Sequence, residues 1–265
     1  MTDYLAAILA RKRRENERRR RHVAAMRPVE RHPEPSRGER GIRALRRASG
    51  RAPSVIAEVK FRSPSAGQIR AWSPGEGVRV AQSYERGGAS VISVLADGPG
   101  FGGSPLLVRR VARAVRVPVL YKEFVLDPVQ VDLAFDVGAS LVLLLVRALD
   151  DRELRSLIAR TRALGMEPVV EAASVGEVDR AIALGSAIIG VNARDLSTFR
   201  VDMEAARAAV NRIPPEHVAV FMSGVRATGD LREVARGRAD AVLIGEGLMR
   251  SEDPGARLSE LVRSV

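Results

Sequence analysis

Lysine is rare in this chain, and its placement is the first sign of chemistry. The 265 residues include 43 lysines and arginines, of which only Lys12, Lys60 and Lys122 are lysine. An arginine side chain stays protonated because its pKa lies above about 12, whereas burial and neighbouring charges can shift a lysine ammonium toward neutral pH. Lys60 and Lys122 each stand at the end of a short apolar run. Retention of lysine at these two places indicates a site that transfers protons.

Further polar residues stand where similar apolar runs end. Glu58 precedes Lys60 by two positions, so both side chains point to the same face of a strand. The polar residues at or just after the ends of later runs are Glu171, Asn192, Arg194 and Ser223. Each alone is an ordinary strand-end residue. Two lysines and two carboxylates brought to one place, however, would be costly unless they are paired or functional.

The elements that would position these residues are eight short apolar runs, rich in β-branched side chains. They span residues 55–60, 89–96, 117–124, 140–149, 167–173, 187–194, 217–223 and 240–247. Each run is continuously apolar rather than alternating, as in strands buried on both faces of a parallel sheet. Amphipathic stretches separate the runs, and several of them end in glycine, a helix C-cap signal. Eight such units predict an α/β fold, a (β/α)8 TIM barrel over residues 51–265.

The barrel prediction agrees with the placement of the polar residues, because catalytic groups in such barrels lie at the carboxyl ends of the strands. An open, doubly wound sheet is the competing architecture, but no G-x-G-x-x-G motif follows the first run. Gly224 and Gly245 follow the last two runs. In many barrels the backbone N–H groups of these two loops hold a phosphate. The pattern therefore favours a small phosphorylated substrate.

Residues 1–50 differ from the rest and are expected to form a helical extension that caps the barrel. Residues 3–26 read as a helix, residues 27–40 as a loop rich in proline and charge, and residues 41–49 as a short helix. The net charge of +11 is concentrated in the run 11–21. We interpret this run as a solvated helix face; a nucleic-acid arm is the alternative, but aromatic side chains that would stack on bases are absent from it.

Composition excludes several classes of protein. The chain has no cysteine, so disulfides and thiolate metal sites are excluded, and its three histidines are scattered. The longest apolar run, residues 141–146, is too short to cross a bilayer. We expect a cytoplasmic protein without metal or organic cofactor, without nucleic-acid or membrane partners, and either monomeric or weakly self-associating.

Several motifs together resemble the indole-3-glycerol phosphate synthase family. They are E-x-K-x-x-S-P-S at 58–65, GFGGS at 100–104, YKEF at 121–124, N-x-R-D-L at 192–196, and SGV and IGEGLMR at 223–225 and 244–250. The resemblance covers nearly the whole chain. It implies a barrel whose N-terminal helices cover the active-site mouth. It also implies cofactor-free ring closure of 1-(2-carboxyphenylamino)-1-deoxyribulose 5-phosphate in tryptophan biosynthesis, with loss of CO2 and water.

The resemblance assigns roles by matching positions. Lys122 matches the general acid at the ketone, and Lys60 matches the lysine that holds the substrate carboxylate and assists dehydration. The carboxylates that manage protons and the cationic nitrogen would be Glu58 and Glu171, with Asn192 and Ser223 near the sugar. The residues implied in substrate and phosphate binding are Arg62, Ser63, Phe101, Phe124, Leu143, Arg194, Gly224, Gly245 and Glu246, of which Phe101, Phe124 and Leu143 would surround the anthranilate ring.

Four positions depart from the family pattern. Glu123, Met222, Ala96 and Gly247 stand where the family usually has Asp, Glu, Thr and Ser. The change at Met222 removes a carboxylate from a proton-handling site. Two alternatives therefore stay open beside the family reaction: a paralogue that closes an indole ring on a modified substrate, and a basic binding protein with an inactive barrel.

Overall fold

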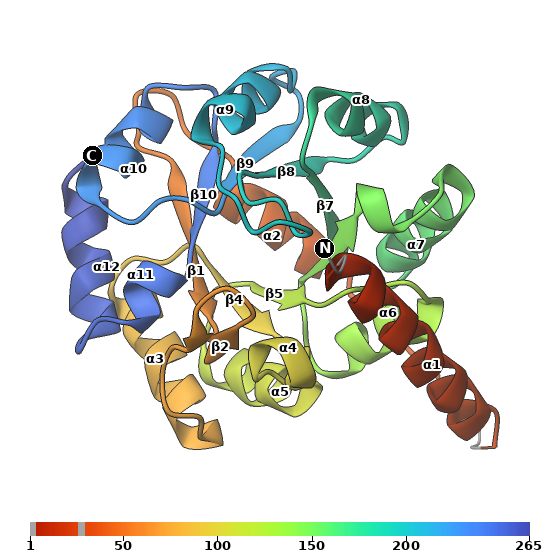
Figure 1. The fold of residues 1–265 in the computed structure, drawn as a ribbon. Coiled ribbons are helices and arrows are strands. Elements are labelled where there is room, and N and C mark those ends of the chain that lie inside the picture. Colours follow the sequence, from red (N-terminus) through yellow and green to blue (C-terminus); the bar gives the residue numbers. More distant parts are fainter. Residues whose placement is uncertain (1–3, 26–29) are drawn as a thin grey trace.

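The computed structural model describes residues 4–25 and 30–265, in which eight parallel strands close into a barrel (Figure 1). The barrel strands are β1 (Ser54–Val59), β4 (Val91–Leu95), β5 (Val119–Lys122), β6 (Leu141–Leu145), β7 (Glu167–Ala172), β8 (Ile188–Asn192), β9 (Val218–Met222) and β10 (Ala241–Ile244). Every strand pairs with its sequence neighbours, and β10 pairs with β1. The predicted (β/α)8 barrel and all eight predicted strands are confirmed.

Helices follow the strands and surround the barrel. They are α3 (Pro74–Arg86), α4 (Gly98–Phe101), α5 (Pro105–Ala114), α6 (Pro128–Asp136), α7 (Asp151–Ala163), α8 (Val175–Ala183), α9 (Met203–Asn211), α10 (Thr228–Ala235), α11 (Glu246–Met249) and α12 (Pro254–Arg263). Several begin with a side-chain cap, such as Ser73 before α3 and Asp150 before α7. These caps satisfy backbone N–H groups that a first helical turn leaves without partners.

The strands are buried along almost their whole length, which explains their continuously apolar composition. Residues 141–145 of β6 are all buried, as are those of β4. Polar side chains enter the strands mainly at the carboxyl ends, where Lys122 ends β5 and Asn192 ends β8. The run predicted to extend to residue 149 ends at Leu145, because the chain turns there into the 3-10 helix η1 (Val146–Ala148).

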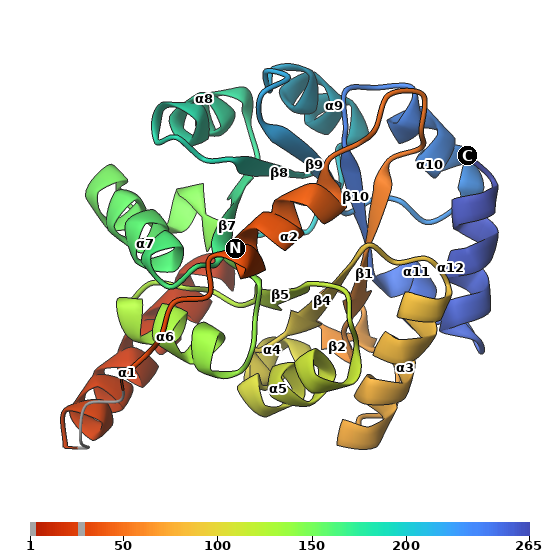
Figure 2. The ribbon, with the colours of Figure 1, turned by 180° about the vertical axis from the view of Figure 1, so that it is seen from behind.

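The N-terminal segment contacts both ends of the barrel. Helix α1 (Tyr4–Ala24) begins at the mouth, where the Tyr4 ring packs edge-on against Phe199 at 5.2 Å, and then runs along α6 (Figure 1). Helix α2 (Ser36–Leu45) crosses the opposite end, against β1, β4, β7 and β9 (Figure 2). It begins at Ser36 rather than at residue 41, because the backbone angles of Pro35 are already helical.

Helix α1 buries one face despite its basic sequence. The buried positions follow helical spacing and are Leu5, Ile8, Leu9, Lys12 and Asn16. Most of the arginines after Lys12 are exposed. The prediction of a solvated basic run is therefore wrong for Lys12 and Asn16. In the described part of the chain, no helix combines the length and the apolar character needed to cross a membrane.

Candidate active site

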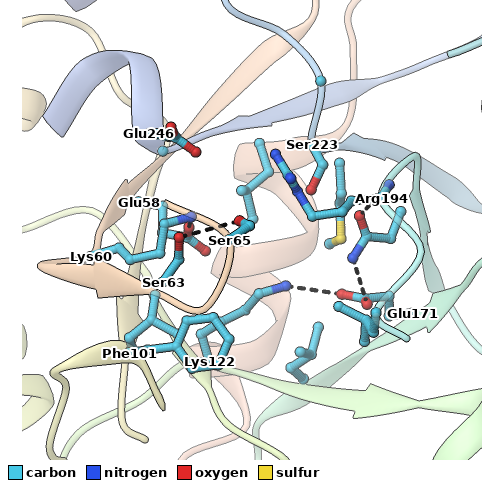
Figure 3. A pocket seen from close by; sticks show the side chains of 18 of the residues that line it. Glu58, Lys60, Ser63, Ser65, Phe101, Lys122, Glu171, Arg194, Ser223 and Glu246 are labelled. Carbon is cyan, nitrogen blue, oxygen red and sulfur yellow. Dashed lines mark hydrogen bonds and ion pairs between the residues drawn. The ribbon is translucent and has the colours of Figure 1, made fainter. Parts of the chain in front are cut away.

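A cavity opens at the carboxyl ends of the barrel strands, and it gathers nearly all of the predicted site residues (Figure 3). The predicted residues that line it are Glu58, Lys60, Ser63, Phe101, Lys122, Phe124, Leu143, Glu171, Asn192, Arg194, Ser223, Gly224, Gly245 and Glu246. Among the predicted residues, Arg62 alone does not line it.

The first lysine of the cavity is paired with a buried carboxylate. Lys60 follows β1, and its Nζ lies 2.7 Å from Oε2 of Glu58. The strand period of two places both side chains on the inner face, as predicted. Gly245, at the end of β10, packs directly over this pair: a Cβ there would lie 2.6 Å from the same Glu58 oxygen. Glycine at position 245 therefore leaves space for the carboxylate.

The charge of Glu58 is favoured by its two lysine neighbours. Burial alone would raise the pKa of this carboxyl, but the charges of Lys60 and Lys122, together with hydrogen bonds to the carboxylate, outweigh burial, and the pKa lies below its ordinary value of 4.5. Glu58 is therefore an anion at neutral pH. It can accept a proton or stabilise a cation, but it is not a proton donor in the resting site.

Substitution Glu58→Gln should lower the free energy of unfolding in a pH-dependent way. A carboxyl whose pKa is depressed by folding contributes stability above its unfolded pKa and loses it as pH falls through the folded pKa. The difference between wild type and Glu58→Gln should therefore be largest above about pH 5 and shrink below about pH 4. Urea titrations at a series of pH values measure it. A difference that stays constant down to pH 3 would contradict the assignment.

The second lysine belongs to a connected set of three polar side chains. Lys122 Nζ, at the end of β5, lies 2.9 Å from Oε2 of Glu171 on β7. The other oxygen of Glu171 accepts a hydrogen bond of 2.9 Å from the Asn192 amide on β8. Asn192 Oδ1 in turn accepts from the backbone N–H of Arg194 at 3.0 Å. The Lys122 ammonium is thus held at a fixed place over the cavity (Figure 3).

One side of the cavity is apolar. The Phe101 and Phe124 rings lie 6.0 Å apart with an interplanar angle of 40°. Leu143 on β6 lines the cavity with them, together with Leu95 and Leu145. An aromatic ring of a ligand would fit against such a wall, with Lys122 entering the cavity beside Phe101 (Figure 3).

The loops after β9 and β10 form another part of the lining. Ser223 and Gly224 both have a positive φ, 67° and 84°, so the chain turns sharply after β9. The backbone N–H groups of Gly224 and Val225 donate to no acceptor among the described residues. Gly245 and Glu246 begin α11 beside them. Unused N–H donors next to glycine make this the part of the cavity best suited to an anion.

Ser63 and Arg62 lie in the small hairpin of β2 (Arg62–Ser63) and β3 (Gly67–Gln68), which follows β1. Ser63 enters the cavity lining and its hydroxyl accepts from the backbone N–H of Ala66. Arg62 instead donates to the carbonyl oxygens of Gly98 and Pro99. The structure therefore does not bring Arg62 together with the other predicted residues, because alternate residues of a hairpin point to opposite faces.

Further lining residues were not predicted as site residues, although Ser65, Leu196 and Val225 stand within the quoted motifs. They include Ser65, Leu196, Phe199, Val225, Arg226 and Leu243. Leucine and valine next to a strand end are common in any barrel, so composition does not separate them from core residues. In the described part of the chain, no group of three or more histidine, cysteine or acidic side chains is placed to hold a metal ion.

Comparison with known proteins agrees with this geometry. The family model of indole-3-glycerol phosphate synthase matches residues 5–261. The chain belongs to this family. A relative of that name from Mycobacterium ulcerans (strain Agy99) is 45% identical over 208 residues, which are 78% of this chain and 76% of the relative. One from Mycobacteroides abscessus is 46% identical over 210 residues, 79% of this chain and 76% of the relative. The family predicted from the motifs is confirmed.

Solved structures of lower identity share the fold alone. An N-acetylmannosamine-6-phosphate 2-epimerase from Clostridium perfringens superposes with a TM-score of 0.63 at 12% identity, over 89% of this chain and all of that one. A thiamine phosphate pyrophosphorylase from Pyrococcus furiosus gives 0.60 at 17% identity, over 84% of this chain and 96% of that one.

Met222 stands where the resemblance led us to expect a glutamate, and the structure shows where its side chain lies. Its side chain is 1% exposed and lies over Gly190 of β8, where an added Cβ would be 2.6 Å from the methyl carbon. Met222 also touches the cavity. A thioether neither donates nor accepts protons, so this position fills space beneath the site.

Substitution Met222→Ala should therefore affect stability more than chemistry. Loss of a buried methionine side chain costs about 2–5 kcal/mol of unfolding free energy through lost contacts and the cavity left behind. We expect kcat to stay within about tenfold of wild type, because no proton carrier is lost. Denaturant unfolding and steady-state kinetics on the same preparation test both parts. A much larger fall in kcat without destabilisation would indicate a chemical role for Met222.

Proposed function

We propose that this chain converts 1-(2-carboxyphenylamino)-1-deoxyribulose 5-phosphate to indole-3-glycerol phosphate, the lyase reaction of its family in tryptophan biosynthesis. The observation that carries the proposal is the pair of Lys–Glu contacts, Lys60–Glu58 and Lys122–Glu171, within one cavity. An apolar wall belongs to the same cavity, as do Gly224 and Val225, whose N–H groups have no acceptor among the described residues. These parts match a substrate with an aromatic ring at one end and a phosphate at the other.

Binding energy would come from the two ends of the substrate. The anthranilate ring packs against Phe101, Phe124 and Leu143, and the phosphate binds at the loops that carry Gly224 and Gly245. Holding both ends brings the ketone of the sugar chain toward the ring carbon that bears the carboxylate. Lys60 would hold that carboxylate. Part of its contact with Glu58 would then be replaced by the contact with the substrate.

Ring closure would use Lys122 as the acid. The ring carbon that bears the carboxylate attacks the ketone carbon, and the ketone oxygen takes a proton from Lys122 and becomes a hydroxyl. Positive charge develops on the nitrogen conjugated with the ring. Glu171 stays beside Lys122 and, with Glu58, stabilises this cation through its negative charge. Asn192 keeps Glu171 in place.

Loss of CO2 and of water would complete the reaction. The carboxylate leaves as CO2, and its bonding electrons return to the ring and neutralise the nitrogen. The new hydroxyl then leaves as water with a proton from Lys60, and the adjacent carbon gives up a proton to a carboxylate of the site. The double bond formed between these two carbons completes the indole. Ser223 lies near the sugar hydroxyls in this arrangement.

The deciding experiment follows indole formation directly. Purified protein is mixed with the carboxyphenylamino-deoxyribulose phosphate, and the fluorescence of indoleglycerol phosphate is recorded. A Lys122→Met protein prepared in parallel corrects for contaminating enzyme. Turnover that exceeds this control by at least a hundredfold is expected. Equal rates in the two samples would refute the proposal.

A second candidate activity rests on Met222. A paralogue that closes an indole ring on a modified anthranilate would keep both lysines while tolerating an apolar residue at this position. Ring-substituted analogues of the substrate distinguish the two. If an analogue gives a higher kcat/KM than the unsubstituted compound, the paralogue reading replaces the first.

We further propose that the enzyme works in the cytoplasm as a monomer or weak homo-oligomer. The absence of cysteine and the biosynthetic role of the family support this location. Sedimentation at several protein concentrations tests the state of association.

A further inference from the structure

The third lysine of the chain is buried where α1 meets the barrel mouth. Lys12 is 2% exposed, and its Nζ lies 2.8 Å from Asp97, 3.0 Å from Glu123 and 3.0 Å from Glu15. Asp97 and Glu123 are themselves buried. An ammonium has three N–H donors, and here each has one carboxylate acceptor. A compact ammonium carries its three donors on one atom, whereas a guanidinium is larger and spreads its donors over a plane, so three acceptors gathered around one point favour lysine here.

The two buried carboxylates both continue into the active site. The free oxygen of Asp97 accepts from the backbone N–H of Gly100 at 2.7 Å and caps α4, the turn that carries Phe101. The free oxygen of Glu123 accepts from the backbone N–H of Phe124 at 2.8 Å. Phe101 and Phe124 are the aromatic side of the cavity. One ammonium on α1 thus connects to both rings, each through one carboxylate and one backbone bond.

We propose that Lys12 is a positioning residue for the reaction: by binding Asp97 and Glu123 together, it sets the spacing of Phe101 and Phe124 and so the fit of the substrate ring. The inference rests on the proposed function, because it assigns these rings to the aromatic part of the substrate. Lys12 itself does not line the cavity. Its effect passes through the two loops.

The charges around this cluster decide what its loss would do. Burial raises the pKa of Glu123, and Asp97 raises it further, while Lys12 opposes both. The charged and titratable groups around Asp97 and Glu123 are Lys12, Arg11, Glu15, Arg19 and Tyr121. Arg11 contacts Asp97 at 2.6 Å, but among the described residues it forms no ion pair with Glu123. Without Lys12, Glu123 would be left as a buried carboxylate with its main counter-charge gone.

Substitution Lys12→Met should raise KM more than it lowers kcat, because ring placement changes while Lys122 and Glu171 remain. We expect kcat/KM to fall about 10- to 100-fold. The loss should grow with pH, since Glu123 is neutral below its raised pKa and becomes an uncompensated anion above it. Lys12→Met/Glu123→Gln, which removes both charges, should show a smaller loss that no longer depends on pH. Lys12→Arg should not restore wild-type KM.

A second readout needs no substrate. Hydrogen exchange at the Gly100 and Phe124 amides, followed in peptides covering 96–104 and 122–126, should accelerate in Lys12→Met. The matched control is Arg20→Met, which removes an exposed ion pair between the same helix and Asp127. It should leave both peptides and KM unchanged.

The outcomes separate the two proposals. The role of Lys12 is overturned if these amides exchange as slowly in Lys12→Met as in wild type. It is also overturned if the variant is folded and its KM is unchanged. A fall in the kcat/KM of Lys12→Met that is equal at every pH, and that the added Glu123→Gln does not reduce, also overturns it, because simple loss of folding would have the same effect. A wild-type protein with no turnover, yet with faster exchange in Lys12→Met, overturns the proposed function and with it the assignment to the substrate ring.

Discussion

Lys122→Arg should lose most of its turnover although the positive charge is kept. Arginine donates a proton poorly because its pKa exceeds about 12, and its planar group cannot take the place of an ammonium 2.9 Å from Glu171. Loss of general-acid catalysis typically costs about 10²- to 10⁴-fold in rate. We expect the loss in kcat, with KM changed much less, because the phosphate and the ring keep their contacts.

Steady-state kinetics with fluorescence detection measures this effect. Arg155→Lys, an exchange between the same two residue types on the exposed face of α7, serves as the control and should match wild type. If Lys122→Arg keeps kcat within threefold of wild type, proton transfer by this residue is refuted, and lysine at position 122 is required for another reason.

Glu171→Gln should have the second-largest effect. The carboxylate accepts from both Lys122 and Asn192, and it is 5% exposed. Glutamine keeps the size but removes the charge that holds the ammonium and stabilises the cationic intermediate. Removal of one such electrostatic contact costs about 10²- to 10³-fold in kcat. The amide would also place an N–H group against either Lys122 or Asn192, which disturbs the position of the acid.

The same strand offers a matched control for Glu171→Gln. Glu167 begins β7 and contacts Arg162 at 2.7 Å at the other end of the barrel. Glu167→Gln changes the same residue type on the same strand, again within an ion pair, but away from the cavity. We expect its kcat to equal that of wild type. Similar losses in the two variants would mean that the effect of Glu171 arises from strand stability rather than from chemistry.

The barrel could be predicted from the sequence because each strand is buried on both sides. That requirement produces runs such as residues 141–145, which no surface strand would tolerate. Polar residues within or just after such runs were then conspicuous, and Glu58, Lys60, Lys122 and Glu171 do come together in the cavity. Strand ends were less predictable: β6 stops at Leu145 although the apolar sequence continues, because the chain turns there into η1.

The features that could not be predicted depend on contacts between distant segments. Lys12 lies in a basic run, and nothing near it in sequence indicates that Asp97 and Glu123 will surround it. Arg62 was expected at the phosphate, but the direction of its side chain is set by the hairpin of β2 and β3. Met222 looked like a lost charge, and its packing over Gly190 becomes visible only when β8 and β9 are side by side.

The contacts of the N-terminal segment have a consequence for biosynthesis of the chain. Residues 4–45 emerge from the ribosome before any barrel strand. The surface that α2 contacts nevertheless includes β9, which emerges far later. Such long sequence separations slow folding, because chain entropy is lost before the contacts form. Docking of α2 can therefore be completed only after β9 has been translated and has joined the barrel.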